Sequence, residues 1–330
     1  MSHALPSLSI VVEMENIRTV EPAVLGIVLD SLAAQLWPVM GRLARPPRLI
    51  FVHPGKVEAN DEVLARIRQD GPSLRSLDIH AVAVPDGRYY EMKNAGAALA
   101  ENEILIFADS DAPPEGDWLL QLLAAFEDPE TVAASGRTFL KHDDFLSRTL
   151  ALTWIFPLEH GDEQEARQAF IWANNVAFRR DWFADAGGFP YDMGFKCSCS
   201  LLDQRLLDAG KTCIRVNARA RHEPLRGLRF VAWRAGVTGR DDDRKYLLRK
   251  SGRRLKRVRY AIKRWNAMMW RTTRKVVTKR KLVNMPAREV PFALLLGWTF
   301  YTIAFANQLG RATGLSTEKV ERIPEIFEPQ

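Results

Sequence analysis

The chain has 330 residues, of which 47% are hydrophobic and 26% charged, and its formal net charge is +7. These proportions exclude a disordered or fibrous protein and fit one large globular domain or two small ones. Three cysteines exclude a disulfide-rich secreted scaffold, and the N-terminus lacks the pattern of a secretory signal, so we expect a reduced, cytosolic setting. Cys197 and Cys199 are separated by a single residue, Ser198, a spacing that does not indicate a zinc site.

Short apolar runs and helical stretches alternate along the first half of the chain. Apolar or β-branched runs predict strands at 9–12, 48–52, 79–84 and 104–108. Spacing and composition predict helices between them at 22–36, 61–68 and 89–100. Strands that alternate with helices predict an α/β fold in which a mostly parallel sheet carries helices on both faces.

The pattern continues less regularly toward residue 222. It predicts helices at 118–126, 146–158 and 201–209, and strands at 131–139 and 212–216. The predicted helix at 146–158 is strongly apolar and could face an acceptor cleft. Gly210 follows the predicted helix at 201–209 and is a common signal for a helix end.

An acidic tripeptide follows the apolar run at 104–108. The run stops at Asp109-Ser110-Asp111, and two prolines and a glycine then prevent the strand from continuing. Ligands of open α/β sheets bind beyond the carboxyl ends of the strands. Carboxylates there can bind Mg²⁺ or Mn²⁺ together with substrate phosphates, although a polar turn is an equal alternative for the tripeptide alone.

Five features in sequence order resemble glycosyltransferase family 2, an inverting group with the GT-A fold. They are the polar turn with Asn16, the helix start Lys93-Asn94-Ala95-Gly96, the strand ending in Asp109 and Asp111, the block from Asn175 to Arg180 with Gly187-Gly188-Phe189, and Arg205-Leu206 with Gly210 and His222. The resemblance covers about residues 8–224. It implies a GT-A (nucleotide-diphospho-sugar transferase) fold with a mostly parallel central sheet, to which this chain adds a helical C-terminal extension.

The resemblance also implies a function and a set of site residues. The enzyme would be hexosyltransferase-like (EC 2.4) and metal-dependent, and it would invert the sugar carbon. It would move a sugar from a nucleotide-sugar donor to a hydroxyl of a glycan, lipid or cell-surface precursor, as in cell-envelope polysaccharide biosynthesis. The implied ligands of Mn²⁺ or Mg²⁺ are Asp109, Asp111 and His222. The implied donor-binding residues are Glu13, Glu15, Asn16, Lys93, Asn94 and Asp109.

Two departures from the family pattern bear on the mechanism. The family often carries an acidic pair seven and six residues before the helix arginine, but Ser198 and Cys199 stand there. A hydroxyl acceptor needs a proton acceptor, so Asp203 is the first candidate for the general base and Asp192 the second. The second predicted strand also lacks the usual aspartate, which leaves the nucleotide open. The missing pair supports an alternative, a non-catalytic relative that binds a nucleotide-sugar or glycan. A nucleotidyltransferase on a similar fold is a further alternative, which the acidic Glu13-Met14-Glu15 disfavours.

The C-terminal third carries a strong positive charge. Residues 244–288 contain no Asp or Glu. An apolar stripe recurs there at helical spacing, formed by Leu255, Val258, Ile262, Trp265 and Met269. A helix with one apolar and one cationic face is typical of an anionic membrane surface. Nucleic acid is not expected because no nucleic-acid motif accompanies the charge, and an ordinary packed helix is the remaining alternative.

Residues 290–309 form an uncharged apolar run that is long enough to span a bilayer. The positive flank on its N-terminal side would keep the preceding residues at the cytoplasmic face. A single span, a half-inserted helix and a packed helix all remain open. We therefore expect a GT-A catalytic domain at 1–225, a basic amphipathic segment at 226–285, a membrane-associated helix at 286–310 and a polar tail at 311–330.

Overall fold

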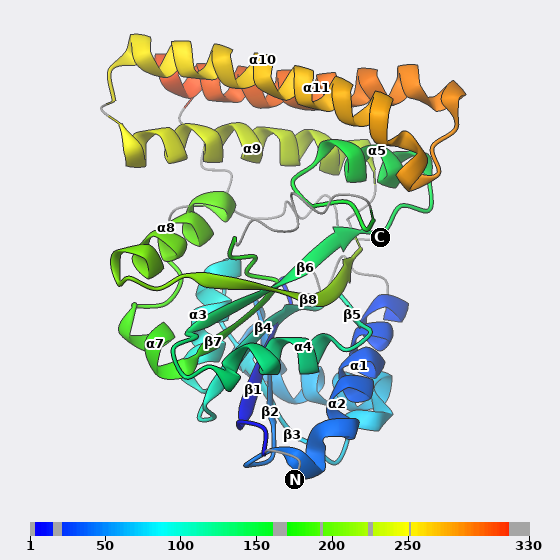
Figure 1. Cartoon of the computed structure of the whole chain (residues 1–330), viewed down its shortest axis with the longest axis vertical. Helices are drawn as coiled ribbons and strands as arrows, with labels where there is room; N and C mark the ends of the chain where they lie inside the picture. The colour runs from blue at the N-terminus through cyan, green and yellow to red at the C-terminus, as the bar shows by residue number, and fades with distance from the viewer. Residues whose placement is uncertain are drawn as a thin grey trace.

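The computed structural model describes residues 4–15, 22–160, 170–191, 194–223, 227–250 and 252–316. Two predicted site residues, Asn16 and Asp192, lie outside these ranges. Within them, eight strands form one sheet in the order β3-β2-β1-β4-β7-β6-β8-β5 (Figure 1). The strands are β1 (Leu8–Glu13), β2 (Arg48–His53), β3 (Asp78–Ala83), β4 (Ile104–Asp109), β5 (Pro114–Glu115), β6 (Ala133–Leu140), β7 (Asn175–Arg179) and β8 (Cys213–His222).

The sheet is parallel on one side and mixed on the other. Strands β3, β2, β1 and β4 all run in one direction. Beyond them β7 is antiparallel to both β4 and β6, β8 is parallel to β6, and β5 is antiparallel to β8. Glu13 is in register with Asp109, so β1 and β4 end at the same edge. The predicted α/β fold is confirmed.

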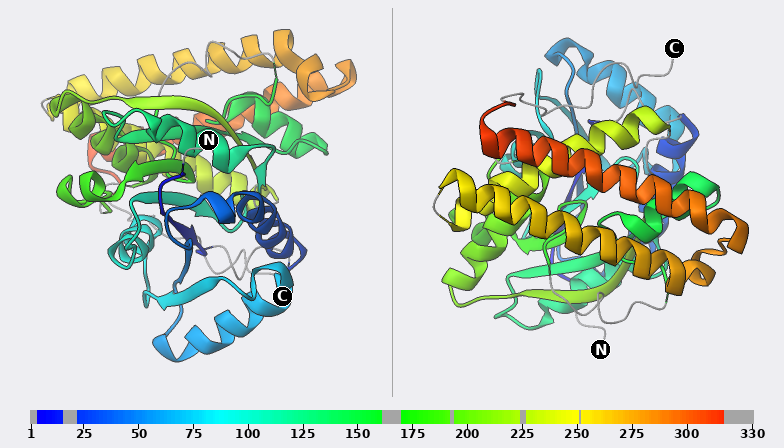
Figure 2. Two further views of the ribbon diagram at one scale, coloured as in Figure 1. Left: turned by 60° about the horizontal axis from the view of Figure 1, so that its bottom comes forward. Right: turned by 90° about the horizontal axis from the view of Figure 1, so that it is seen from above.

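Helices cover both faces of the sheet (Figures 1 and 2). One face carries α1, α2 and α4, whose core includes Leu29 and Trp118. The other carries α3, α7 and α8, whose core includes Phe178 and Phe189. Strands β1 and β4 are buried throughout because both of their faces are covered, which explains their apolar runs. The helices are α1 (Pro22–Leu36), α2 (Asn60–Asp70), α3 (Tyr89–Ala98), α4 (Trp118–Ala124), α7 (Arg180–Asp185) and α8 (Phe195–Asp208).

A helical layer lies across one end of the molecule. It consists of α5 (Phe145–Thr153), α9 (Leu228–Arg249), α10 (Arg254–Lys279) and α11 (Val290–Thr313). Helices α10 and α11 run alongside each other on the outside, with α9 beneath them (Figures 1 and 2). A Cβ at Gly239 of α9 would lie 2.0 Å from the carbonyl oxygen of Ala304 in α11. Glycine is therefore required where these two helices cross.

Within the described residues, two helical stretches have the length and composition to cross a membrane, Ala23–Arg42 and Ala287–Thr313. Core helices of soluble proteins satisfy the same criteria. The first stretch buries Leu25, Leu29 and Leu32 against the sheet. The second buries small and aromatic residues against α9 and α10 but leaves a row of apolar side chains exposed.

The largest differences from the predicted element boundaries are at α5, α8 and β8, each for a local reason. Helix α5 ends at Thr153 instead of residue 158, because Trp154 is extended and Phe156 precedes a proline. Helix α8 begins six residues earlier than predicted, directly after Gly194, whose positive φ of 81° sets the start of the helix. The prediction missed these first residues because Cys and Ser, which are frequent there, are weak helix formers. Strand β8 continues to His222, which places this histidine at the strand end.

Candidate active site

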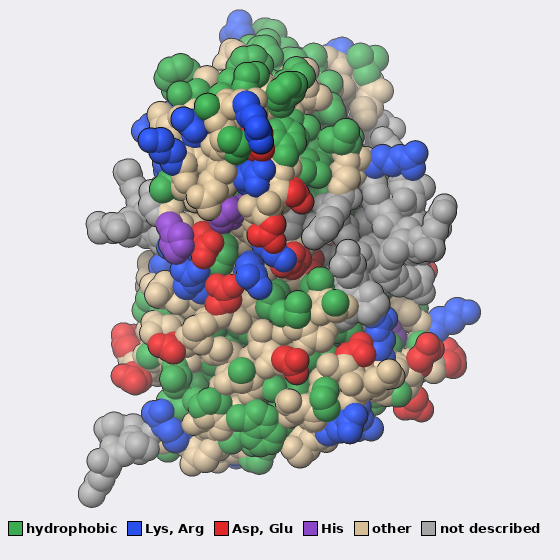
Figure 3. Space-filling model, turned by 90° about the vertical axis from the view of Figure 1, so that its right-hand side faces the viewer, with side chains coloured by type: hydrophobic (Ala, Val, Ile, Leu, Met, Phe, Trp, Pro, Cys, Tyr) green, Lys and Arg blue, Asp and Glu red, His purple; other side chains and the backbone are tan. Residues whose placement is uncertain are grey.

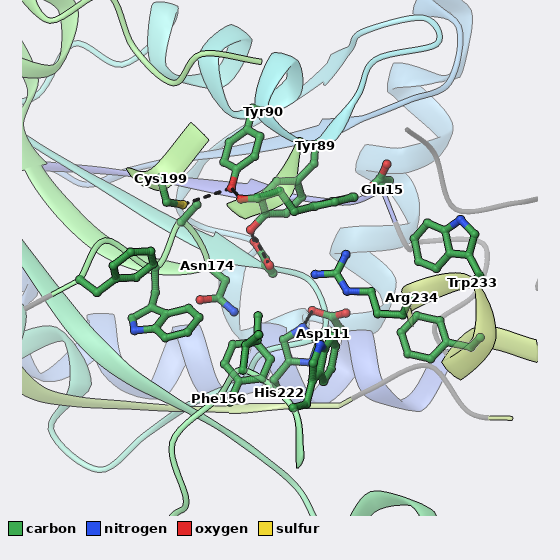
Figure 4. A pocket seen from close by; sticks show the side chains of 18 residues that line it. Glu15, Tyr89, Tyr90, Asp111, Phe156, Asn174, Cys199, His222, Trp233 and Arg234 are labelled. Atoms are coloured by element: carbon green, nitrogen blue, oxygen red, sulfur yellow. Dashed lines mark hydrogen bonds and ion pairs between the residues drawn. The ribbon is translucent and has the colours of Figure 1, made fainter. Parts of the chain in front are cut away.

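A pocket lies where β1 and β4 end, between the sheet and the helical layer. Figure 4 shows its lining side chains, which come from the strand ends, from α3 and α8, and from the helical layer. They are Glu15, Tyr89, Tyr90, Asp109, Asp111, Trp154, Ile155, Phe156, Phe170, Trp172, Ala173, Asn174, Phe195, Cys199, His222, Phe230, Trp233 and Arg234. The lining is mainly aromatic, and its few charged groups lie near the end of β4.

Three predicted metal ligands come together at this pocket. One ligand atom from each of Asp109, Asp111 and His222 lies within 4.8 Å of the other two. The Nε2 atom of His222 is 3.7 Å from Oδ1 of Asp111. The strand ends are joined by a hydrogen bond of 2.8 Å from the Glu223 amide to the Asp111 carbonyl. The Nδ1 atom of His222 is buried without a hydrogen-bond partner among the described residues.

This donor set fits a divalent cation. Carboxylate oxygens suit Mg²⁺ and Mn²⁺, and the imidazole adds a nitrogen donor. Asp109 is the last residue of β4 and Asp111 lies in the turn directly after it, so both carboxylates stand at the same strand end.

Asp109 is held by two neighbours from α3. The Lys93 ammonium lies 2.6 Å from Oδ1 of Asp109, and the Tyr89 hydroxyl donates to the same carboxylate at 3.0–3.1 Å. Lys93 is fully buried and also donates to the Ala108 carbonyl oxygen at 3.2 Å. Burial, followed by the charges of Asp109 and Glu15, raises the pKa of the Glu13 carboxyl well above its usual value. Lys93 thus balances a concentrated negative charge at the strand ends.

The predicted donor-binding residues divide into two groups. Glu15 and Asp109 line the pocket. Glu13 and Lys93 are buried behind it, and Asn94 faces the Gly187-Gly188-Phe189 turn. The Asn94 side chain accepts from the Phe189 amide at 2.9 Å and donates to its carbonyl at 2.7 Å. In this geometry Lys93 and Asn94 support the site from behind and do not line the pocket.

The start of α8 presents neutral groups where an acidic pair was expected. Cys199 lines the pocket, with its Sγ 3.1 Å from the Tyr90 hydroxyl, and burial raises the pKa of its thiol. The Ser198 hydroxyl donates to the carbonyls of Gly194, at 2.9 Å, and of Pro190. Asp203 lies one turn further along α8, half-buried and outside the pocket lining. Burial raises the pKa of Asp203, and the nearby Lys245 lowers it.

Sequence reasoning missed the contribution of α9. Phe230, Trp233 and Arg234 reach the pocket from this helix, beyond the region that carries the family motifs. No local pattern marks them, because only the packing of α9 against the end of the sheet brings them there. Tyr89 and Tyr90 were also missed, although they lie only four and three residues before Lys93.

Comparisons with known proteins agree with this architecture. The family "Glycosyl transferase family 2" matches residues 19–187. A glucosyl-dolichyl phosphate glucuronosyltransferase from Haloferax volcanii is 24% identical over 177 residues, which is 51% of this chain and 53% of that protein. The match therefore spans about half the length of this relative.

A solved structure resembles nearly the whole chain. It is a mannosyltransferase from Pyrobaculum calidifontis in complex with GDP-Man and Mn²⁺, with a TM-score of 0.56 and 14% identity. The similarity covers 96% of this chain and 89% of that one, so it includes the helical layer. The chain therefore belongs to glycosyl transferase family 2 and has the GT-A fold, as its motifs predicted.

Proposed function

We propose that this chain is a metal-dependent, inverting glycosyltransferase that moves a hexose from a nucleotide-sugar to a glycan or lipid acceptor. The convergence of Asp109, Asp111 and His222 on an aromatic pocket is the observation that carries this proposal. Breaking the glycosidic bond of a nucleotide-sugar leaves growing negative charge on the departing diphosphate. Mn²⁺ or Mg²⁺, held by these three residues, would stabilise that charge.

The protein's own groups prepare the site for this chemistry. Lys93 and Tyr89 fix the orientation of Asp109, so that little reorganisation is needed when a ligand binds. Glu15 lies at the end of β1, where a nucleotide could reach it. Aromatic side chains such as Trp154 and Phe156 exclude water from the pocket and offer flat surfaces to a sugar.

The general base stays a prediction. Asp203 lies outside the pocket lining, and Lys245 lies near it, so the described geometry gives it little support. Asp192 lies outside the described residues. The neutral Ser198 and Cys199 favour the second candidate function, a non-catalytic relative that binds a nucleotide-sugar or glycan without transferring it.

We further propose that the chain works at the cytoplasmic face of a membrane. Exposed apolar side chains on the two outer helices form what we name the α10–α11 face: Leu255, Ile262, Trp270, Val277, Phe292, Leu295 and Trp298. Trp270 is 71% exposed and Phe292 is 64% exposed. Figure 3 shows hydrophobic, Lys and Arg side chains gathered at this end of the molecule. This mixture suits an anionic lipid surface, with α10 and α11 lying in its plane.

Release of nucleoside diphosphate from a panel of nucleotide-sugars with Mn²⁺ or Mg²⁺ tests the proposed function. We expect metal-dependent release from one donor by the wild type and by Asp117→Asn, whose exposed side chain makes no cap bond to α4. Asp111→Asn should lose this release. Metal-dependent binding of a donor without release, even when acceptors are supplied, would favour the non-catalytic alternative. Absence of both binding and release would refute the metal-site assignment.

A further inference from the structure

The imidazole of His222 is held differently from the carboxylate of Asp109, which receives side-chain hydrogen bonds from α3. The backbone carbonyl of His222 accepts from the Lys141 amide at 3.2 Å, and the next amide, of Glu223, donates to the Asp111 carbonyl at 2.8 Å. These bonds fix the strand end but leave the imidazole able to rotate about its two side-chain torsions. The orientation of the ring therefore depends on contacts of the side chain itself.

A hydrogen bond usually orients a metal-binding histidine, because the ring nitrogen that does not bind the metal donates to a carboxylate or carbonyl. The Nε2 atom of His222 is 3.7 Å from Oδ1 of Asp111, so Nε2 is the ring nitrogen on the side of the predicted metal ligands. The other nitrogen, Nδ1, is buried and has no hydrogen-bond partner within the described ranges. Hydrogen bonds from the described residues therefore do not fix this ring.

Two aromatic rings contact the imidazole instead. The centre of the Phe156 ring lies 5.2 Å from that of the His222 ring, with 37° between their planes. The Trp154 ring is nearly perpendicular to the imidazole, at 6.4 Å and 83°. Both aromatic side chains are buried, and Figure 4 shows His222 between Phe156 and Asp111. Rings packed at two different angles restrict both torsions of the imidazole.

The helical layer in turn holds the Trp154 ring. Trp154 follows the last residue of α5, and the Tyr301 hydroxyl of α11 donates to the carbonyl of Thr153 directly before it. From α9, the Arg234 guanidinium lies 5.3 Å from the centre of the Trp154 ring. Contacts from α5, α9 and α11 therefore fix a ring that packs on His222.

We propose that Phe156 and Trp154 are positioning residues that orient the imidazole of His222 toward a divalent cation. This inference rests on the proposed function, because it requires that Asp109, Asp111 and His222 hold the metal. It goes beyond that function by giving the helical layer, which lies outside the sheet that carries these ligands, a role in metal binding. Without the two rings the imidazole would be free to rotate away from the carboxylates, and the cation would bind more weakly.

Binding of Mn²⁺ alone, without nucleotide, tests this assignment in the whole chain. Electron paramagnetic resonance counts the free Mn²⁺, and its pulsed form detects coupling between bound Mn²⁺ and a histidine nitrogen. Phe156→Leu and Trp154→Leu should each weaken Mn²⁺ binding about 10-fold, the lower end of the effect of groups that orient metal ligands. Both variants should also reduce the nitrogen coupling. Trp154→Phe, which keeps a ring, should recover most of the affinity.

Two reference variants separate orientation of the histidine from a general loss of packing. Phe183→Leu removes a buried ring that packs against Phe178 and Phe189 on the sheet and does not line the pocket. This variant should keep the Mn²⁺ affinity within about 2-fold of wild type, because distant sites with no shared partners act independently. His222→Gln sets the loss of affinity and of nitrogen coupling expected when the imidazole itself is absent.

Unchanged Mn²⁺ affinity and nitrogen coupling in folded Phe156→Leu and Trp154→Leu proteins would overturn the inference. An equal loss of affinity in Phe183→Leu would also overturn it, because packing alone would then explain the effect. Wild-type affinity in His222→Gln would do the same, since the histidine would not be a ligand. Failure of the wild type to bind Mn²⁺, alone or with a nucleoside diphosphate, would instead refute the metal site of the proposed function.

Discussion

Two buried acidic clusters in this chain differ in what their carboxylates contact. At the end of β4, Asp109 and Asp111 line a pocket and approach His222. In the middle of α9, three consecutive aspartates form ion pairs inside the helical layer. Asp241 pairs with Arg240, Asp242 with Arg264, and Asp243 with Arg257, at 2.9, 3.1 and 2.7 Å. None of these three lines the pocket.

The difference follows from the geometry of the two elements. Successive helix residues point about 100° apart, so three neighbouring carboxylates on α9 face three directions and meet three cations. Asp109 ends β4 and Asp111 lies in the turn that follows, so both carboxylates stand at one strand end, where they approach His222. An acidic run therefore indicates a metal site only when its secondary structure lets the carboxylates meet.

The first and largest expected effect separates the two clusters by metal binding. Asp111→Asn should weaken Mn²⁺-dependent binding of nucleoside diphosphate roughly 100-fold or more, because a direct ligand matters at least as much as the groups that orient ligands. Titration calorimetry would measure this affinity. Asp243→Asn should leave it within experimental scatter. Equal losses of nucleotide affinity in the two variants would show that the two clusters do not differ in metal binding.

A second prediction concerns the contribution of the α9 cluster to stability. Asp243→Leu leaves Arg257 without its carboxylate inside the helical layer, where Arg257 also donates to the Arg311 carbonyl at 2.9 Å. Breaking a buried pair in this way should lower the free energy of unfolding by about 3 kcal/mol. Urea denaturation would measure the change.

The matched control for that stability prediction removes both partners. Asp243→Leu combined with Arg257→Leu should recover much of the loss, because no unpaired charge then remains. A double variant that is as unstable as the sum of its single changes would show that the pair does not act as a unit.

The outer side of the same layer gives a third, smaller prediction. Replacing Ile262 and Trp270 by Ser should reduce binding to anionic vesicles about 30-fold, because each partly inserted side chain contributes about 1 kcal/mol. Vesicle co-sedimentation at several salt concentrations would measure it. Replacing exposed Trp37 and Val57, on the sheet half of the molecule, should have no effect. Equal binding by both double variants would rule out the α10–α11 face as the docking surface.

The last prediction concerns the cysteine thiols of both regions. Burial raises the pKa of Cys197, next to Asp241, and of Cys213 in β8 to about 12. Because the thiolate is the reactive form, at pH 9 only about 0.1% of each folded thiol should be reactive, compared with about three quarters in the unfolded chain. Alkylation followed by mass spectrometry should show slow labelling that accelerates on unfolding and as the pH approaches 12. Rapid labelling of the folded protein near pH 9 would contradict this burial.

Local sequence alone determined much of the fold and the centre of the site. The strands β1 to β4 and the helices between them were predicted because their apolar periodicity is local. The position of Asp109 and Asp111 at a strand end followed from the same pattern. The basic helix with an apolar stripe from Leu255 to Met269 was also predicted, because residues on one helix face recur every three to four positions.

Tertiary packing decided the rest of the site. The approach of His222 to Asp111 depends on β8 reaching the sheet edge, and the approach of Arg234 depends on α9 crossing that edge. Helical periodicity could not show that Cys199 would face the pocket while Asp203 lies a turn beyond it. A sequence pattern specifies which residues share an element, whereas contacts between distant elements arise only when layers pack to bury their apolar faces.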